Sequence, residues 1–313
     1  MASRPTRVPV KRVTRRDAAG GGFAGNQRLV PEETPVAFSY GGTTHAVMMA
    51  TPADLEDFAV GFSLSEGIIR GPDEIETIEV EDHAEGIDVQ IRLAGEAGQD
   101  FTDRRRRMAG PVGCGLCGIE SIEQALKPVA TVAATDLRLT AANIAEATRL
   151  LADFQPLHKD TGAAHAAGFY IPDKGIVMAR EDVGRHNALD KLAGGLCRGR
   201  IDGRAGAVVI TSRVSVEMVQ KTAIIGASVL IAVSAPTALA IRTAEQAGMT
   251  LVALVRASEF DVFTRPDRLG LAPDGRPIRP DDHDQLGGNH KHNPDPAAST
   301  LVQSPTVKLV QYG

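Results

Sequence analysis

Apolar residues in the first third of the chain follow two different periods. Apolar and polar side chains alternate over residues 36–49 on either side of a Gly-Gly pair, which is typical of a β-hairpin. The same alternation at 75–80 and 87–93 predicts a second hairpin. Between the hairpins the spacing becomes helical. We expect this helix to begin with Thr51 at the N-cap and Pro52 at the first helical position.

The second half of the chain alternates short apolar runs with amphipathic segments. Strands are predicted at 169–171, 176–179, 207–210, 229–233 and 250–255. Helices are predicted at 140–153, from 181 through Leu192, at 214–225 and at 236–247. Strands that are apolar almost throughout must be covered on both faces, and the alternation with helices favours parallel pairing. The predicted fold class is therefore α/β, with a mixed or parallel sheet, helices on both faces and N-terminal hairpins.

Polar and basic residues follow the predicted strands directly. Ligands of open α/β sheets bind at the carboxyl ends of the strands, where the connecting loops meet. The residues at these ends are Arg180 to Asn187, Thr211 to Arg213, Ser234 to Pro236, and Arg256. This edge of the sheet is the expected location of a binding site.

Both ends of the chain lack these patterns. Residues 1–25 are rich in arginine and glycine, and we interpret them as a flexible basic arm that is either solvated or in contact with an anionic partner. Residues 270–313 are rich in proline, glycine, aspartate and histidine, and we expect a disordered tail. Between them we expect a hairpin and helix region at 26–135 and an α/β core at 136–269.

The composition excludes several classes of protein. The net charge of -5 over 313 residues argues against bulk binding of nucleic acid. We find no apolar run long enough to span a membrane and no secretory signal at the N-terminus. Three cysteines are too few for a disulfide framework, and their odd number leaves at least one unpaired within the chain. They suit a reducing compartment, and we expect the protein in the cytoplasm.

Two of the cysteines form the most distinctive stretch of the sequence. Cys114 and Cys117 lie on a glycine-flanked loop that follows an arginine run at 104–107 and leads into an amphipathic helix from Ile119. Unpaired N–H groups at a helix N-terminus lower the pKa of a nearby thiol. A fall from about 8.5 to about 7 increases the reactive thiolate roughly tenfold at neutral pH. The stretch therefore indicates a pair of reactive sulfur atoms.

A Cys-x-x-Cys pair alone is compatible with zinc binding, redox chemistry or sulfur transfer. A four-cysteine zinc site lacks its second pair, and a thioredoxin-like site would lie after the first strand of a βαβ unit. A zinc deaminase needs a His-x-Glu triplet on a helix beside the thiolates, but the only such triplet, at 83–85, falls in a predicted hairpin turn. We interpret the third cysteine, Cys197, as a buried structural residue.

Four blocks of sequence resemble the FdhD family of sulfurtransferases, which are required to make active formate dehydrogenase. The blocks are Gly110 to Gly118, Thr161 to Gly168, Glu181 to Gly194, and a long block within 212–269. The resemblance implies a cytoplasmic homodimer with a fold similar to cytidine deaminase. It implies a protein that accepts sulfur from a cysteine desulfurase as a persulfide. The sulfur would pass to molybdenum held by two guanylated pterins, the molybdenum bis(molybdopterin guanine dinucleotide), before this cofactor enters formate dehydrogenase.

The resemblance also implies roles for particular residues. Cys114 would carry the persulfide with Cys117 as its partner, and we expect no metal of the protein's own. The cofactor would contact the stretch Leu254, Val255, Arg256, Ala257, Ser258 and Glu259, together with Asp182, Arg185, His186, Arg213 and Lys221. Cations near strand ends suit phosphates, whereas Asp182 would either accept from guanine or cap a helix. The stretch after the last strand departs from the family's usual Gly-Gly-Arg pattern, and Glu259 would repel phosphate.

Two other functions stay open on the sequence. The chain could bind guanine nucleotide or the pterin cofactor as a chaperone of formate dehydrogenase without moving sulfur. A zinc nucleoside deaminase is the third reading.

Overall fold

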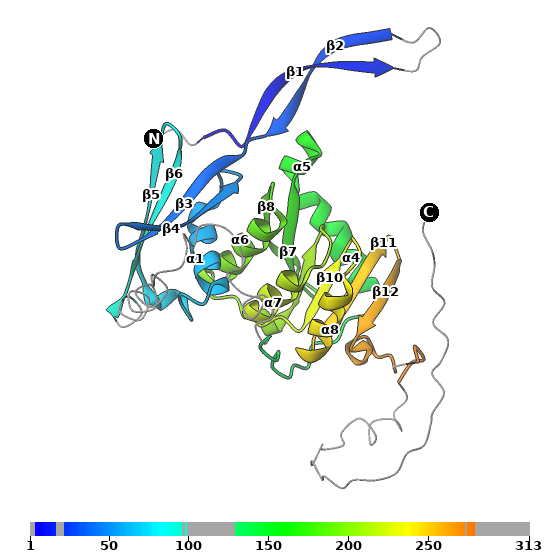
Figure 1. Ribbon diagram of the computed structural model, residues 1–313. Coiled ribbons are helices and arrows are strands. Elements are labelled where there is room, and N and C mark those ends of the chain that lie inside the picture. The colour runs from blue at the N-terminus through cyan, green and yellow to red at the C-terminus, as the bar shows by residue number, and fades with distance from the viewer. Residues whose placement is uncertain (1–3, 17–21, 96–97, 99–128, 273, 279–313) are drawn as a thin grey trace, which may run out of the picture. The chain divides into compact units, whose positions relative to one another are not determined.

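The computed structural model describes residues 4–16, 22–95, 98, 129–272 and 274–278 (Figure 1). Contacts within the chain divide it into a unit of residues 1–277 and a second unit of residues 278–313. The description below concerns the first unit. No helix among the described residues combines the length and apolar character that a membrane span requires.

The larger of the sheets has six strands in the order β12-β11-β10-β9-β7-β8. Its strands are β7 (His165–Ile171), β8 (Gly175–Asp182), β9 (Ala207–Ile210), β10 (Val229–Ala232), β11 (Thr250–Arg256) and β12 (Glu259–Thr264). The three central strands β9, β10 and β11 are parallel, while β7, β8 and β12 run antiparallel to their neighbours. The predicted α/β class is confirmed. The sheet is mixed because short hairpins, rather than crossover helices, add strands at both of its edges.

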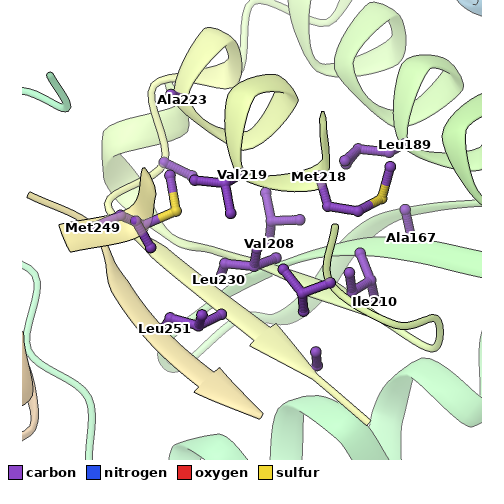
Figure 2. Close-up of a cluster of buried hydrophobic side chains, with 14 of the residues drawn as sticks. Ala167, Leu189, Val208, Ile210, Met218, Val219, Ala223, Leu230, Met249 and Leu251 are labelled. Atoms are coloured by element: carbon purple, nitrogen blue, oxygen red, sulfur yellow. The ribbon is translucent and has the colours of Figure 1, made fainter. Parts of the chain in front are cut away.

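Helices cover both faces of this sheet. Alternate strand residues such as Val208 and Ile210 pack against α6 (Arg185–Arg198), α7 (Val216–Ile225) and α8 (Ala238–Gln246) (Figure 2). The intervening residues, including Val209, pack on the opposite face against α4 (Ala141–Leu151). Helix α4 begins where the sequence predicted it, directly after Thr140. The side chains of Thr140 and Asn143 each accept from the other's backbone N–H in a capping box. The short helix α5 (Pro156–Thr161) follows.

The smaller sheet has four strands in the order β4-β3-β6-β5. These strands are the two predicted hairpins, β3 (Thr34–Tyr40) with β4 (Thr43–Ala50) and β5 (Ile75–His83) with β6 (Gly86–Leu93). Its buried face packs on α1 (Leu55–Ser65), where the ring of Phe38 stacks on Phe62 at 4.6 Å between centroids. Helix α1 then packs against α6 of the larger sheet.

The predicted start of α1 at Thr51 is wrong. The helix begins at Leu55, and its N-cap is Asp54 in a left-handed conformation with φ 53°. The Thr51 hydroxyl instead accepts a hydrogen bond from the N–H of Val183, and its own N–H donates to Asp182. A tertiary contact has therefore replaced the local cap that the sequence suggested.

The flexible basic arm expected at 1–25 contains strand residues that the sequence analysis did not predict. Strands β1 (Arg7–Arg16) and β2 (Gly22–Pro31) pair in register from Arg7 opposite Pro31 to Arg16 opposite Gly22. Val8 and Val10 have the spacing of a strand, but the adjacent Lys11 and Arg12 interrupt the alternation. The local pattern was therefore too short to predict β1.

Candidate functional site

One edge of the larger sheet gathers most of the predicted site residues. The parallel strands β9, β10 and β11 all end at this edge, β7 begins there, and β8 ends there opposite the start of β7. The loops interlock, since the N–H of Val214 donates to the carbonyl of Ala235 and that of Thr211 donates to Ala166. Helices α6 and α7 both start from this edge. The loops of five strands thus meet at the edge where the sequence predicted the site.

Side chains of α6 and α7 meet where the two helices begin. Arg185 and His186 are the first residues of α6, and the Nε2 atom of His186 lies 3.9 Å from a carboxylate oxygen of Glu217 on α7. The Nε atom of Arg185 and Nε2 of His186 are buried, and neither has a hydrogen-bond partner among the described residues. Buried donors of this kind normally have partners. The two side chains can therefore donate to an anion without giving up bonds within the protein.

Two histidines at this edge are held neutral. Burial lowers the pKa of His165 and of His186 below the ordinary value, and the positive charge of Arg185 lowers both further. Lys221 adds to the effect on His186, while Glu217 opposes it. A neutral imidazole can both donate and accept a hydrogen bond near neutral pH. Sequence analysis did not place His165 in the site. His165 is the first residue of β7, and it comes near Arg185 only because β7 runs antiparallel to β8 and β9.

Lys221 is held in an ion pair. Its Nζ atom lies 2.6 Å from Asp190 of α6, which also accepts a hydrogen bond from Ser65 of α1. Part of its charge is thus neutralised within the protein. Arg213, in contrast, is exposed after β9, and its guanidinium has no ion pair among the described residues.

Asp182 is completely buried, and the protein satisfies both of its oxygens. Oδ1 accepts from the N–H of Gly184 at 2.8 Å and from the side chain of Asn187 at 2.9 Å. Oδ2 accepts from the ammonium of Lys191 at 2.6 Å and from the N–H of Thr51 at 3.0 Å. Of the two roles considered for Asp182, the bond to Gly184 corresponds to the cap at the start of α6. We assign Asp182 to this internal network.

The stretch Leu254 to Glu259 comprises the end of β11, the turn at Ala257 and Ser258, and the first residue of β12. Leu254 and Ala257 both have left-handed backbones, with φ 57° and 51°, where glycine is normally favoured. Val255 is buried, whereas Arg256, Ala257, Ser258 and Glu259 are exposed. Arg256 donates to the carbonyls of Val233 and Val255, which ties the turn to the end of β10. The departure from a glycine pattern has not prevented the glycine-like conformation.

The predicted catalytic residues Cys114 and Cys117, and the arginine run at 104–107, lie outside the described residues. Cys197 lies on α6 against the apolar core of the smaller sheet, and burial raises the pKa of its thiol. The triplet at 83–85 occupies the turn between β5 and β6, not a helix. Within the described ranges, no group of three or more potential metal ligands is gathered. The position of the triplet in a hairpin turn, and not on a helix, argues against the deaminase alternative.

The fold and this edge define a class of α/β proteins that collect cationic side chains where parallel strands end, a place suited to anionic ligands. A model of the FdhD/NarQ family matches residues 31–270. The chain belongs to the FdhD/NarQ family.

Several known proteins are similar to this chain. A protein of Agrobacterium fabrum named sulfur carrier protein FdhD is 57% identical over 261 residues, covering 83% of this chain and 96% of that protein. A protein of the same name from Brucella abortus is 55% identical over 79% of this chain and 92% of its own length. A crystal structure from Desulfotalea psychrophila, described as a formate dehydrogenase accessory protein, is 27% identical with a TM-score of 0.67. That comparison covers 85% of this chain and all of the other.

Proposed function

We propose that this chain is a sulfur carrier for the maturation of formate dehydrogenase. It takes sulfur from a cysteine desulfurase as a persulfide on Cys114 and passes it to the molybdenum bis(molybdopterin guanine dinucleotide), acting as a homodimer in the cytoplasm. The observation that carries the proposal is the family match over 31–270, which includes Cys114 and Cys117. Relatives named sulfur carrier protein that cover most of this chain support the same role.

The two thiols can take up one sulfur atom and release it again, with a cellular dithiol to restore them. The thiolate of Cys114 attacks the outer sulfur of the donor's persulfide, and the donor's cysteine leaves as a thiolate. Cys114 then holds the extra sulfur in a new S–S bond. When the thiolate of Cys117 attacks the inner sulfur, a Cys114–Cys117 disulfide forms, and the outer sulfur leaves as sulfide toward the metal of the substrate. A cellular dithiol reduces the disulfide before the next cycle.

The cationic edge supports binding of a polyanionic substrate. Arg185 has a buried guanidinium nitrogen with no partner in the described structure, and Arg213 is exposed. Guanidinium groups bind phosphate through paired N–H donors, and the start of α6 adds backbone N–H groups. The turn at 254–259 faces the same edge through Arg256, although Glu259 opposes a phosphate there. We expect the phosphates of the guanylated pterins to lie nearer Arg185 and Arg213 than Glu259.

Mass spectrometry after incubation with a cysteine desulfurase and cysteine tests the thiol step. We expect the native chain to gain about 32 Da, the mass of one sulfur atom, and Cys114→Ala to gain none that is stable. In cells, Cys114→Ala should also abolish formate dehydrogenase activity. A stable adduct on that variant, together with normal dehydrogenase activity, would contradict the assignment. Dispensable cysteines combined with retained nucleotide binding would instead support the chaperone function.

Binding of guanosine diphosphate, measured by calorimetry, tests the edge separately. Removing one charge-assisted contact to phosphate costs about 1.5–3 kcal/mol, so Arg185→Ala or Arg213→Ala should weaken binding roughly tenfold or more. Lys174→Ala, at an exposed turn between β7 and β8, is the matched control and should change nothing. Equal affinities of all three variants for guanosine diphosphate would show that the nucleotide does not bind at this edge.

A further inference from the structure

The hairpin of β1 and β2 concentrates the basic residues of an otherwise acidic chain. Residues 1–31 hold seven arginines and lysines and a single acidic residue, although the whole chain has a net charge of -5. The family match begins only at residue 31. Strand β1 and nearly all of β2 therefore lie outside the residues that the family model matches.

Arginines at the base of the hairpin are held by the rest of the protein. Arg4 pairs with Asp82, near the end of β5, at 2.6 Å. Arg7 pairs with Asp160 at 3.0 Å, and Arg28 donates to the carbonyl of Thr161, so both contact α5. Farther along the hairpin, Lys11 and Arg12 have no acidic partner among the described residues, and Arg12 bonds only Asn26. The base of the hairpin is thus bound to the rest of the protein, whereas the charges of Lys11 and Arg12 can pair with acidic groups of another molecule.

One face of the hairpin also carries uncovered apolar surface. Val13 is 70% exposed and Phe23 is 76% exposed, and the register places both on the face that holds Lys11. Beside Val13 lies a hollow of about 460 Å³. It is lined by Lys11, Arg12, Val13, Gly25, Asn26 and Gln27. The hollow exists because Gly25 stands opposite Val13 and has no side chain to fill it.

The backbone of the hairpin is incomplete as well. Within the described residues each strand pairs only with the other, so each has one edge of unpaired N–H and C=O groups. An isolated two-stranded hairpin is marginally stable in water, and such edges accept a further strand. Apolar side chains, cations and a free edge thus occur together on one element.

We propose that this hairpin is a docking arm for an acidic, extended segment of a partner protein. The segment pairs with a free strand edge, places one apolar side chain in the hollow at Gly25, and sets carboxylates against Lys11 and Arg12. A nucleic acid has phosphates but no apolar side chain for the hollow, and the acidic remainder of the chain repels it. A lipid surface presents no strand to pair. The inference goes beyond sulfur transfer and does not depend on the thiols.

Fluorescence anisotropy of the full-length chain tests the docking arm. The probe is a fluorescein-labelled synthetic peptide in which glutamate alternates with leucine. We expect it to bind, and binding should weaken as salt rises from about 0.05 M to about 0.5 M, since exposed charges are screened. The same peptide with lysine in place of glutamate should bind at least about tenfold more weakly.

Two variants act on different parts of the site. The charge reversal Lys11→Glu/Arg12→Glu should weaken binding about tenfold or more. Gly25→Leu should do the same by filling the hollow, and it should fold normally because a Cβ at Gly25 meets no atom within 4 Å. The matched reversal of two exposed cations elsewhere, Lys174→Glu/Arg242→Glu, should leave binding unchanged, as should Cys114→Ser.

Three results would overturn the docking arm. The first is absence of peptide binding, or equal binding of the acidic and basic peptides. The second is native affinity in both hairpin variants. The third is tighter binding of a single-stranded oligonucleotide, or of phosphatidylglycerol vesicles, that the same hairpin variants abolish. Because Cys114→Ser is included, a failed sulfur-transfer test and a failed docking test remain separate results.

Discussion

At the scale of single residues, the ion pair of Asp182 on β8 and Lys191 on α6 links the larger sheet to the smaller one through Thr51, which follows β4. Both side chains are fully buried, and Lys191 also donates to the carbonyl of Thr51 at the start of the α1 segment. Its Nζ atom lies 5.4 Å from the centre of the Phe58 ring. A buried charge is stable only when paired, so each partner depends on the other.

Removing one member of this pair should strongly destabilise the protein. We expect Lys191→Met to lower the free energy of unfolding by about 3–5 kcal/mol, because it leaves the carboxylate of Asp182 buried and unpaired. Asp182→Asn/Lys191→Met should lose less than the sum of the two single variants. Urea denaturation measures all three. Additive losses would mean that the two side chains act independently.

The neutral histidines at the sheet edge predict a pH dependence of stability. Because burial lowers the pKa of His165 and His186 in the folded state, the unfolded chain binds more protons. Their effect on stability is therefore absent above a pH of about 6.5, and stability falls as the pH drops toward the folded-state values. His186→Gln should lose less stability than the native chain between about pH 7 and about pH 5.5. Identical losses in urea titrations at the two pH values would contradict this.

Residue roles that depend on near neighbours were predictable, and those that depend on distant ones were not. The capping box at Thr140 and the bond from Gly184 to Asp182 involve residues two or three positions apart. The contacts of Thr51 with Asp182, Val183 and Lys191 join residues more than 130 positions apart. No local pattern announces such partners, and they decide where α1 begins.

At the scale of elements, glycines allow α1 and α6 to touch. A Cβ on Gly61 would lie 1.7 Å from the carbonyl oxygen of Asp190, and one on Gly194 would lie 1.8 Å from that of Asp57. Both of these oxygens are backbone atoms, so they could make room for a Cβ only if the two helices moved apart.

Gly194→Ala should therefore destabilise the protein more than a helical Gly-to-Ala change usually stabilises it. Overpacking costs typically about 1–3 kcal/mol, against a gain of roughly 1 kcal/mol in helix propensity. Thermal unfolding should show a lower midpoint. Gly25→Ala, where the Cβ meets nothing within 4 Å, is the control and should not lower it. A raised midpoint for Gly194→Ala would mean that the helices are not in this close contact.

In the turn between β11 and β12, exchanging alanine for glycine is expected to stabilise the protein. Ala257 holds φ 51°, a conformation that costs a non-glycine residue about 1–2 kcal/mol. Ala257→Gly removes that strain of about 1–2 kcal/mol but loses about 0.4–1 kcal/mol through the greater entropy of the unfolded chain, so we expect a net gain of up to about 1.6 kcal/mol. Ala145→Gly within α4 should instead cost about 0.5–1 kcal/mol. Urea denaturation of both variants measures the difference in sign.

Most elements of the core followed from the sequence because their apolar runs are long and regular. Strand β9 was predicted with its observed bounds, and the two hairpins of the smaller sheet were predicted in their observed positions. Strand β12 was missed because its alternation is short and it pairs through an irregular register with β11. The sequence left open whether the sheet was mixed or parallel, because a strand's direction depends on which neighbour it pairs with and not on its own residues.

At the scale of residues 1–277, the two sheets share charged contacts as well as the helix crossing. Asp57 of α1 is nearly buried, and it accepts from Arg180 of β8 at 2.5 Å and from Arg198 of α6 at 2.6 Å. The smaller sheet is thus attached to the larger one by α1, by the Thr51 network and by Asp57. A binding edge formed at the start of α6 consequently depends on contacts that the smaller sheet supplies.

This attachment predicts that both sheets unfold together, and that Asp57 is needed for it. Hydrogen exchange followed by mass spectrometry should give similar opening free energies for peptides from β3–β6 and from β7–β11 in the native chain. Asp57→Ala leaves Arg180 and Arg198 without their shared carboxylate, so peptides from β3–β6 should open first while those of the central strands remain protected. Arg4→Ala, which removes the pair with Asp82 at the hairpin base, is the control and should leave the two sets together. Equal acceleration of both sets in Asp57→Ala would show that the sheets do not depend on this carboxylate for their coupling.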